Sequence, residues 1–456
     1  MSVNSTISAI STPNAAGGIG IVRISGNDAF AVAEKCFRPV SGKKISEMKG
    51  YTAAYGSAFD GGGDIDDGVC IVYRSPHSYT GENTVEICCH GGLFVMQRVL
   101  RATFSAGAAA AGPGEFTKRA FLNGKMDLTQ AESVMGIISA QGTASLNASR
   151  AALEGAVSRK TEGISHLLLS AAASLAVWAD YPEDDVPAVE GDTLMSSLEN
   201  ALSELKTLIE RCDNGKAVTE GVRTVICGKP NVGKSTLMNL LSGYDRSIVT
   251  SIAGTTRDVV EETVRLGDIV LRLADTAGIR ETEDEVEKIG VGEAKKRLEN
   301  ADLIIAVFDI SRPLSEEDEQ LLAQCRGRRS VAVINKSDLP NVLDTDKIRQ
   351  FIPETLLMSA RAGDAAEELK TVLERVLGVD SVDFTQEILI GERQRQCAVN
   401  ALEYTNEAIE ALQNGLTLDA VNVSIDCALE ELLSLTGKRV TDETVNEVFS
   451  KFCVGK

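Results

Sequence analysis

The chain has 456 residues, of which 43% are hydrophobic and 4% aromatic, and its formal net charge is −20. This length exceeds one compact core and predicts about two or three domains, and the composition is typical of a helix-rich soluble protein. The negative charge excludes sequence-independent nucleic-acid binding over a broad surface, although a local basic patch can still contact RNA.

The sequence shows neither a membrane span nor a metal-binding cysteine pattern. No uninterrupted apolar run approaches the roughly 18 residues that cross a bilayer. The first residues, Met1 to Thr6, lack the basic start and apolar core of a signal peptide. We therefore expect a cytoplasmic protein. The ten cysteines form no Cys-x-x-Cys pair and only three histidines accompany them, which favours scattered reduced thiols.

Residues 1–120 have the pattern of a small α/β domain. Three strand-like apolar runs occur there: Ile19–Ile24, Val69–Tyr73 and Val85–Cys89. The stretch from Phe94 to Ala106 has helical character.

Residues 121–221 have a helical pattern. Five apolar residues share one helix face by their spacing: Leu194, Leu198, Leu202, Leu205 and Ile209. Asn214-Gly215 is a plausible end of that helix. The alanine-rich stretch from Leu167 to Trp178 is a candidate buried helix, and Tyr181-Pro182 breaks it.

Strands and helices alternate from 222 to 380, and helical character returns from 381 to 456. Four short apolar runs follow the first strand of this region: Ile269–Leu273, Leu303–Phe308, Val331–Ile334 and Leu356–Met358. This order predicts a parallel sheet covered by helices. The simplest architecture inserts this domain into a helical domain built from both flanks, although a separate C-terminal helical domain has the same pattern.

The stretch Gly228 to Ser235 is a Gly-x4-Gly-Lys-Ser phosphate loop. It follows the apolar run Val222–Cys227 and leads into a helix, the order that such a loop requires. Glycines let main-chain N–H groups face an anion, and the helix adds its positive end. We expect Lys234 to reach the β- and γ-phosphates and the Ser235 hydroxyl to bind Mg²⁺.

Four further motifs occur in the order typical of GTPases: Thr255–Asp258, Asp275–Gly278, Asn335–Asp338 and Ser359-Ala360. The carboxylate of Asp338 can accept two hydrogen bonds from guanine, a pair that adenine does not offer. Together these motifs predict a GTP-binding domain.

The catalytic machinery departs from the Ras-like pattern. Ile279 stands where Ras-like proteins carry the water-positioning glutamine. A carboxylate of the acidic segment Glu281–Glu287 can orient water, or that segment can simply be solvated. The side chain of Asn231 can bind a monovalent cation near the phosphates with main-chain oxygens of residues 250–255, or it can merely stabilise the turn.

These motifs together resemble the MnmE (TrmE) family of bacterial tRNA-modification GTPases over the whole chain. The stretches that carry the resemblance are Gly228–Ser235, Ile248–Asp258, Asp275–Arg280, Phe452–Lys456, Gly18–Gly26, Tyr79–Glu82, His90–Gly92, Gly112–Phe116 and Arg119–Lys125. The N-terminal block and the terminal Cys-x-Gly-Lys discriminate this family from other translation GTPases.

The resemblance implies a multidomain α/β and all-α fold. Residues 1–120 would form an α/β domain that dimerises and binds tetrahydrofolate. Residues 121–221 and 381–456 would form a discontinuous helical domain, and 222–380 an inserted Ras-like P-loop GTPase domain. The implied folate contacts are Arg23, Glu82, Lys125 and Lys456. A glutamate can read the pterin edge, and Arg and Lys suit the carboxylates of the glutamyl tail.

The resemblance also implies the nucleotide and metal ligands. GTP would contact Asn231, Val232, Gly233, Lys234, Ser235, Thr236, Thr250, Ser251, Ile252, Ala253, Gly254, Thr255, Thr256, Asp275, Thr276, Ala277, Gly278, Asn335, Lys336, Ser337, Asp338, Ser359, Ala360 and Arg361. Mg²⁺ would bind Ser235 and Thr256, and the catalytic glutamate would be Glu287. K⁺ would bind Asn231, Thr250, Ile252 and Thr255.

The family's activity and partners follow from the same resemblance. A homodimer joins a flavin-dependent MnmG-type protein in a heterotetramer. Together they place an aminomethyl or carboxymethylaminomethyl group on carbon 5 of the wobble uridine of certain tRNAs. The one-carbon donor is 5-formyltetrahydrofolate or 5,10-methylenetetrahydrofolate. Cys453 is either a nucleophile or a structural thiol.

Two other classes of GTPase are weighed against this one. A ribosome-assembly GTPase of the Era or Der type would carry a basic RNA-binding module or a second phosphate loop, and neither stands out in the sequence. A signalling switch would hydrolyse GTP very slowly without a helper protein, whereas the resemblance implies acceleration by K⁺ alone.

Overall fold

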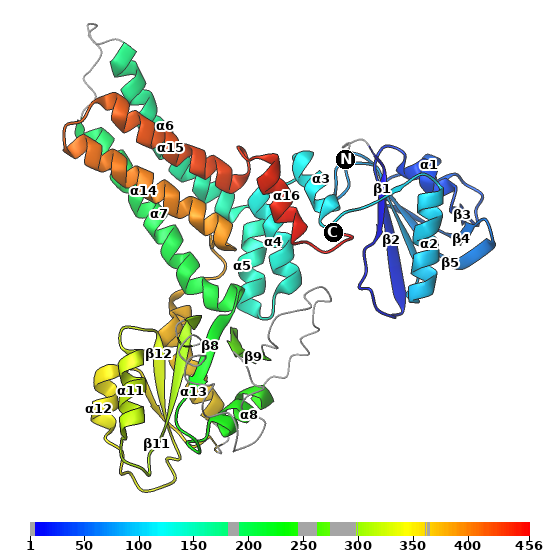
Figure 1. The fold of residues 1–456 in the computed structure, drawn as a ribbon. Helices are drawn as coiled ribbons and strands as arrows, with labels where there is room; N and C mark the ends of the chain where they lie inside the picture. The colour runs from blue at the N-terminus through cyan, green and yellow to red at the C-terminus, as the bar shows by residue number, and fades with distance from the viewer. Residues whose placement is uncertain are drawn as a thin grey trace. The chain divides into compact units, whose positions relative to one another are not determined.

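The structure is a computed structural model that describes residues 5–180, 191–244, 262–273, 298, 300–360, 362 and 365–456 (Figure 1). The chain forms two compact units. Unit 1 consists of Met1–Met135 and Leu433–Lys456, and unit 2 consists of Gly136–Leu432.

Unit 1 is built on a seven-stranded sheet with the strand order β3-β4-β5-β6-β2-β1-β7. The strands are β1 (Ile7–Ile10), β2 (Ile19–Ser25), β3 (Phe37–Pro39), β4 (Thr52–Asp60), β5 (Gly63–Tyr73), β6 (Thr84–His90) and β7 (Ala109–Ala110). Neighbouring strands are antiparallel except β1 and β7. The three predicted strand runs are confirmed as parts of β2, β5 and β6.

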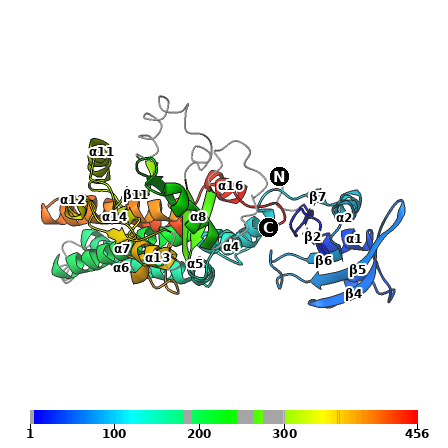
Figure 2. The ribbon, with the colours of Figure 1, turned by 90° about the horizontal axis from the view of Figure 1, so that it is seen from below.

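One face of this sheet is covered by two helices, α1 (Ala29–Glu34) and α2 (Leu93–Ser105) (Figure 2). Alternate residues of the strands point to this face and form one apolar core with both helices. The predicted helix over 94–106 is confirmed within one residue at each end. A 3-10 turn, η1 (Ile45–Glu47), leads toward β4.

The rest of unit 1 joins the two ends of the chain. α3 (Glu115–Leu122) and the start of α4 (Leu128–Ser139) pack with α16 (Asp442–Ser450). Phe121, Phe449 and Phe452 form the aromatic centre of this cluster, with ring centroids 5.2 to 6.3 Å apart.

The helices of unit 2 come from both sides of the predicted GTPase domain. They are α5 (Thr143–Leu153), α6 (Ala156–Asp180), α7 (Gly191–Thr219), α14 (Glu392–Gln413) and α15 (Leu418–Thr436). α7 packs along α6 and α14 (Figure 1). Arg395 Nε lies 2.6 Å from Asp213 Oδ1, and so ties α14 to α7. The predicted insertion of the α/β domain into a helical domain is therefore confirmed.

Two details of the predicted helices are wrong. α7 continues through Asn214-Gly215, where an end was expected. Gly215 serves packing there, because a Cβ on it would lie 3.2 Å from Ile388 Cγ2. The helix at 167–178 is confirmed as part of α6, but it is amphipathic, since Leu168 is buried while Leu169 is 59% exposed.

The inserted sheet has the strand order β13-β12-β11-β8-β10-β9. Its strands are β8 (Val222–Cys227), β9 (Glu262–Leu266), β10 (Ile269–Leu273), β11 (Leu303–Asp309), β12 (Ser330–Asn335) and β13 (Thr355–Leu357). The predicted parallel pairing holds for β8, β10, β11, β12 and β13. The prediction missed β9, which pairs antiparallel with β10 through a tight turn.

Helices cover both faces of this sheet. α8 (Lys234–Tyr244) and α13 (Ala365–Leu377) pack on one face, and α11 (Glu316–Cys325) and α12 (Thr345–Phe351) pack on the other. Because both faces are covered, β11 and β12 are buried along their whole length, and they are apolar over 303–308 and 331–334. A 3-10 turn, η2 (Val379–Ser381), leads back to the helical part. Among the described helices, none is long and apolar enough to cross a membrane.

Candidate functional site

The phosphate loop connects β8 to α8 and has an unusual backbone. Gly228, Asn231 and Gly233 have φ values of 145°, 66° and 105°. Both glycines are also required sterically. A Cβ on Gly228 would lie 2.3 Å from the Val307 carbonyl, and one on Gly233 would lie 2.1 Å from Asn335 Nδ2. Asn231 is one of the few residue types that enter the left-handed region readily.

Lys234 begins α8, directly after the loop, and Ser235 and Thr236 follow in its first turn. The Lys234 ammonium donates to the carbonyls of Gly228 and Lys229, each at 2.7 Å. Burial lowers the pKa of Lys234. The N-terminal N–H groups of α8 and this ammonium give the loop a positive electrostatic potential, which suits phosphate oxygens.

Asn335 joins three of the sequence motifs. Asn335 is the last residue of β12 and is 3% exposed. Nδ2 donates to the Val232 carbonyl at 2.9 Å, and Oδ1 accepts from the Ala360 N–H at 2.9 Å. The structure therefore brings the phosphate loop and the segment at Ser359-Ala360 together around this one amide.

The residues after Asn335 form the edge where a base can bind. Lys336 has φ 62° and its Nζ donates to the Asn231 carbonyl at 2.8 Å. The Ser337 N–H donates to the Met358 carbonyl at 3.3 Å. Asp338 is exposed. A fixed main chain beside an exposed carboxylate is a suitable arrangement for reading the hydrogen-bond donors of guanine.

Several predicted site residues lie outside the described residues. They are Thr250, Ser251, Ile252, Ala253, Gly254, Thr255, Thr256, Asp275, Thr276, Ala277, Gly278, Glu287 and Arg361, and Ile279 is among them too.

The sequence analysis missed two buried carboxylates beside the loop, Asp309 and Asp318, each 4% exposed. Asp309 ends β11 and lies 2.6 Å from Lys336 Nζ. Burial acts to raise the pKa of Asp309, but hydrogen bonds from Lys336 and Ser311 outweigh it and leave that pKa below its ordinary value. Asp318 belongs to a capping box with Ser315, and the Ser-x-x-Asp spacing is the signal that could have revealed it.

The predicted folate contacts all lie in unit 1. Arg23 on β2 donates to Glu86 Oε1 at 2.8 Å. Its guanidinium lies 5.7 Å from the Tyr79 ring centroid and 5.5 Å from that of Phe116. Arg23 Nη1 also lies 3.5 Å from the Gly455 carbonyl, next to Lys456.

Glu82 contacts β2 at Ser25, which is on the same face of the strand as Arg23. The Ser25 hydroxyl donates to Glu82 Oε2 at 2.7 Å. Arg119, which is 4% exposed, donates to both oxygens of Glu82 at 3.2 and 3.3 Å and to Glu115 at 2.9 Å. The sequence analysis did not single out Arg119 or Ser25.

Lys125 and Lys456 complete this group. The Lys125 stem passes within 3.3 Å of a Cβ built on Gly81, the neighbour of Glu82, and its Nζ donates to the Pro76 carbonyl at 3.1 Å. The Lys456 carbonyl accepts from the Phe116 N–H at 3.1 Å. The chain therefore places cationic groups together with Glu82, Glu86 and Glu115 on the Arg23 side of the sheet.

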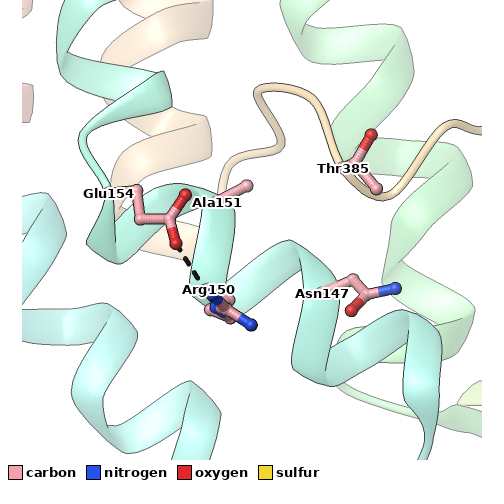
Figure 3. A pocket seen from close by; sticks show the side chains of 5 residues that line it. All are labelled: Asn147, Arg150, Ala151, Glu154 and Thr385. Atoms are coloured by element: carbon pink, nitrogen blue, oxygen red, sulfur yellow. Dashed lines mark hydrogen bonds and ion pairs between the residues drawn. The ribbon is translucent and has the colours of Figure 1, made fainter.

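A hollow of about 200 Å³ in unit 2 lies away from these sites. It is lined by Asn147, Arg150 and Ala151 of α5, by Glu154 directly after this helix and by Thr385 (Figure 3). Arg150 and Glu154 are both largely exposed and form an ion pair at 3.3 Å. Within the described ranges no group of His, Cys, Asp or Glu is arranged to hold a metal ion. All ten cysteines are free, as predicted.

The parallel sheet, the phosphate loop at the end of β8 and the guanine-type motif at the end of β12 define a P-loop guanine-nucleotide-binding protein. The N-terminal residues 6–125 match the family model "GTP-binding protein TrmE N-terminus". Residues 128–453 match "MnmE helical domain". The chain belongs to the MnmE family of tRNA modification GTPases, and it is an enzyme that hydrolyses GTP.

Curated relatives agree over their full lengths. The chain is 41% identical to "tRNA modification GTPase MnmE" of Lachnoclostridium phytofermentans, over 99% of both chains. It is 38% identical to the protein of the same description from Clostridioides difficile, over 100% of both. Among solved structures, the FeoB G domain of Methanococcus jannaschii covers 34% of this chain and 98% of its own, with 22% identity. Its TM-score is 0.25, and that likeness carries no argument.

Proposed function

We propose that this GTPase depends on K⁺ and Mg²⁺ and acts on the wobble uridine of certain tRNAs. With a flavin-dependent MnmG-type partner it would add an aminomethyl or carboxymethylaminomethyl group to carbon 5 of that base. 5-Formyltetrahydrofolate or 5,10-methylenetetrahydrofolate would supply the one-carbon unit. The proposal covers the domain bounds 1–120, 121–221, 222–380 and 381–456, and a homodimer that joins the partner in a heterotetramer.

The backbone conformation of Asn231 is the observation that supports the nucleotide and cation part of this proposal. Its φ of 66° lies in the middle of the phosphate loop, and its carbonyl is already engaged by Lys336. The side-chain amide oxygen is the group of Asn231 that we assign to the cation. A neutral oxygen ligand suits K⁺, and the hydroxyls of Ser235 and Thr256 suit Mg²⁺ as hard oxygen donors.

The described residues support binding and orientation of GTP. Lys234 would exchange its two carbonyl acceptors for the β- and γ-phosphates, and the first turn of α8 adds N–H donors. When bound, K⁺ supplies positive charge to the transition state where an arginine finger would otherwise act. Glu287 would orient the attacking water.

The folate part is supported by the group around Arg23. Arg23, Lys125 and Lys456 are cations suited to the carboxylates of a folate glutamyl tail. Glu82 has oxygens suited to the amide and amino edge of a pterin. Tyr79 and Phe116 flank the Arg23 guanidinium, so its position is fixed by packing as well as by the ion pair with Glu86.

The cation dependence is tested by GTP turnover of the purified protein in KCl and in NaCl at equal ionic strength. We expect turnover at least about ten-fold faster in K⁺, because the oxygens of Asn231 and of residues 250–255 would hold K⁺ beside the phosphates better than the smaller Na⁺. Equal rates in the two salts would reject the role of Asn231 as a cation ligand.

Folate binding is tested by titration with 5-formyltetrahydrofolate. Arg23→Ala should weaken binding by roughly ten-fold or more, because it removes a charged hydrogen-bond donor. Arg38→Ala is the matched control, since Arg38 belongs to the same sheet and forms an ion pair with Asp64 in which both side chains are exposed to solvent. Binding that is absent in the native protein, or indifferent to Arg23→Ala, would reject the assignment.

A further inference from the structure

The phosphate loop is tied on one side to the start of α11. Lys229 Nζ lies 2.6 Å from Asp318 Oδ2 and donates to Ser315 Oγ at 2.7 Å. The same Asp318 oxygen accepts from the Ser315 N–H at 2.9 Å. Lys229 is thus held by a capping box whose geometry is set by the helix itself, and its own carbonyl accepts from Lys234.

The other side of the loop is tied to the end of β11. Asp309 Oδ2 lies 2.6 Å from Lys336 Nζ, and Lys336 Nζ lies 2.8 Å from the Asn231 carbonyl. The second carboxylate oxygen of Asp309 accepts from the Ser311 N–H and hydroxyl at 3.0 and 2.7 Å. One oxygen of the carboxylate is therefore held by Ser311, while the other contacts Lys336.

Both ties act on a loop whose conformation is intrinsically unfavourable. Asn231 is a non-glycine residue at φ 66°, a left-handed conformation that is less favourable than the ordinary helical or extended ones unless its surroundings hold it. The loop also directs N–H dipoles of like sign toward one point, and these dipoles repel one another. Two buried carboxylates, each acting through a lysine, hold residues 229 and 231 and so oppose both effects.

We propose that Asp309 and Asp318 are positioning residues of the GTPase, which hold the phosphate loop in its anion-binding shape before nucleotide arrives. This inference rests on the assignment of Gly228 to Ser235 as the GTP phosphate site. Neither carboxylate is among the residues assigned to contact the nucleotide. Each acts through a lysine, and the short segment from β11 to α11 thereby controls the affinity of the loop.

The test is the dissociation constant for GDP carrying a methylanthraniloyl label. Asp309→Asn and Asp318→Asn each keep the size of the side chain and remove its charge. We expect each to weaken binding by roughly ten-fold, as for the loss of a charged hydrogen bond. Glu319→Gln is the control, because Glu319 lies on the same helix in an exposed ion pair with Lys347. Native affinity in both aspartate variants overturns the proposal.

The double variant Lys229→Met/Asp318→Leu distinguishes a positioning role of this ion pair from a role in stability alone. Replacing both partners of a buried ion pair with apolar groups is often neutral for stability, whereas removing one partner is costly. Positioning predicts a double variant with native thermal stability and GDP binding still about ten-fold weaker. Native affinity in a stable double variant would show that the pair only stabilises the fold, and would overturn the proposal for Asp318.

Lys234→Ala distinguishes failure of this inference from failure of the site assignment. Loss of GDP binding in Lys234→Ala, together with native binding in the aspartate variants, leaves the phosphate site in place and rejects the positioning role. Native binding in Lys234→Ala rejects the phosphate site and the positioning role together.

Discussion

A single amide, that of Asn335, holds the nucleotide site together. Its donor and acceptor reach Val232 in the phosphate loop and Ala360 after β13. Asn335 is thus the central contact between motifs that are 103 and 25 residues away in sequence. Its guanine-motif position was predictable from sequence, but the two partners were not, because they depend on where three strands end in one sheet.

Glu287 is expected to orient the attacking water. Glu287→Ala should lower the turnover number by roughly 100-fold and leave GTP affinity nearly unchanged, because the carboxylate would act in the transition state rather than in binding. Steady-state hydrolysis and labelled-nucleotide titration measure the two quantities. Glu281→Ala, in the same acidic segment, is the control. Normal turnover in Glu287→Ala would mean that another carboxylate acts.

Exposed cysteine thiols should react with an alkylating reagent, whereas buried ones should not. Burial raises the pKa of Cys36, Cys70 and Cys212 to about 12, so at pH 8 these thiols stay protonated and unreactive. Cys453 is exposed. Brief treatment of the native protein with iodoacetamide, followed by peptide mass spectrometry, should label Cys453 and spare those three. Comparable labelling of Cys36 would contradict their burial.

At the scale of elements, the turn between β9 and β10 reaches the first turn of α5. Asp268 Oδ1 accepts from the Ala144 N–H at 3.3 Å, and the N-cap residue Gly142 has no side chain to do so. A Cβ on Gly142 would lie 2.7 Å from that carboxylate oxygen. The start of α5 is therefore capped by the inserted domain, and Ala144 joins its apolar core.

Removing this cap should loosen α5. Asp268→Ala leaves an N-terminal N–H group of the helix without its acceptor, at a cost of about 1 kcal/mol. Hydrogen exchange of the amides at 144–147 should become faster by roughly five-fold, as that free energy implies. Asp268→Asn retains an acceptor oxygen and should exchange almost as slowly as the native protein. Equal exchange in native and Asp268→Ala proteins would exclude the capping role.

At the scale of the molecule, the last residues complete unit 1. Val454 bridges Pro113, and the Ser11 hydroxyl donates to the Gly455 carbonyl at 3.0 Å. Gly455 has φ 98°, and a Cβ on it would lie 2.2 Å from the Ile10 carbonyl. The C-terminal segment thus lies against the edge of the N-terminal sheet through main-chain contacts.

Deletion of Cys453–Lys456 should weaken unit 1 selectively. Without these main-chain contacts, amides of β1 and of the first turn of α3 should exchange faster, while those of β11 and β12 should not change. Lys456→Ala keeps the main chain and serves as the control. It should exchange like the native protein, although 5-formyltetrahydrofolate would bind it more weakly. Unchanged exchange in the deletion variant would show that the segment adds no stability.

The sequence by itself determined three strands of unit 1, five strands of the inserted sheet, several helices, the phosphate loop and the family, because these depend on local spacing and on contiguous motifs. It missed β1, β3, β4, β7 and β9, because short segments or segments of mixed polarity become strands only through pairing with their neighbours. It also placed a helix end at Gly215, which packs against Ile388 inside α7 instead. Only the tertiary structure decided which carboxylates serve the site. In the sequence Asp309 looks like an ordinary surface charge, while Asp318 and Arg119 are marked only by the capping-box spacing and by a stretch that carries the family resemblance. They differ because the fold buries them against a charged partner, where an ion pair is strongly directional and poorly screened.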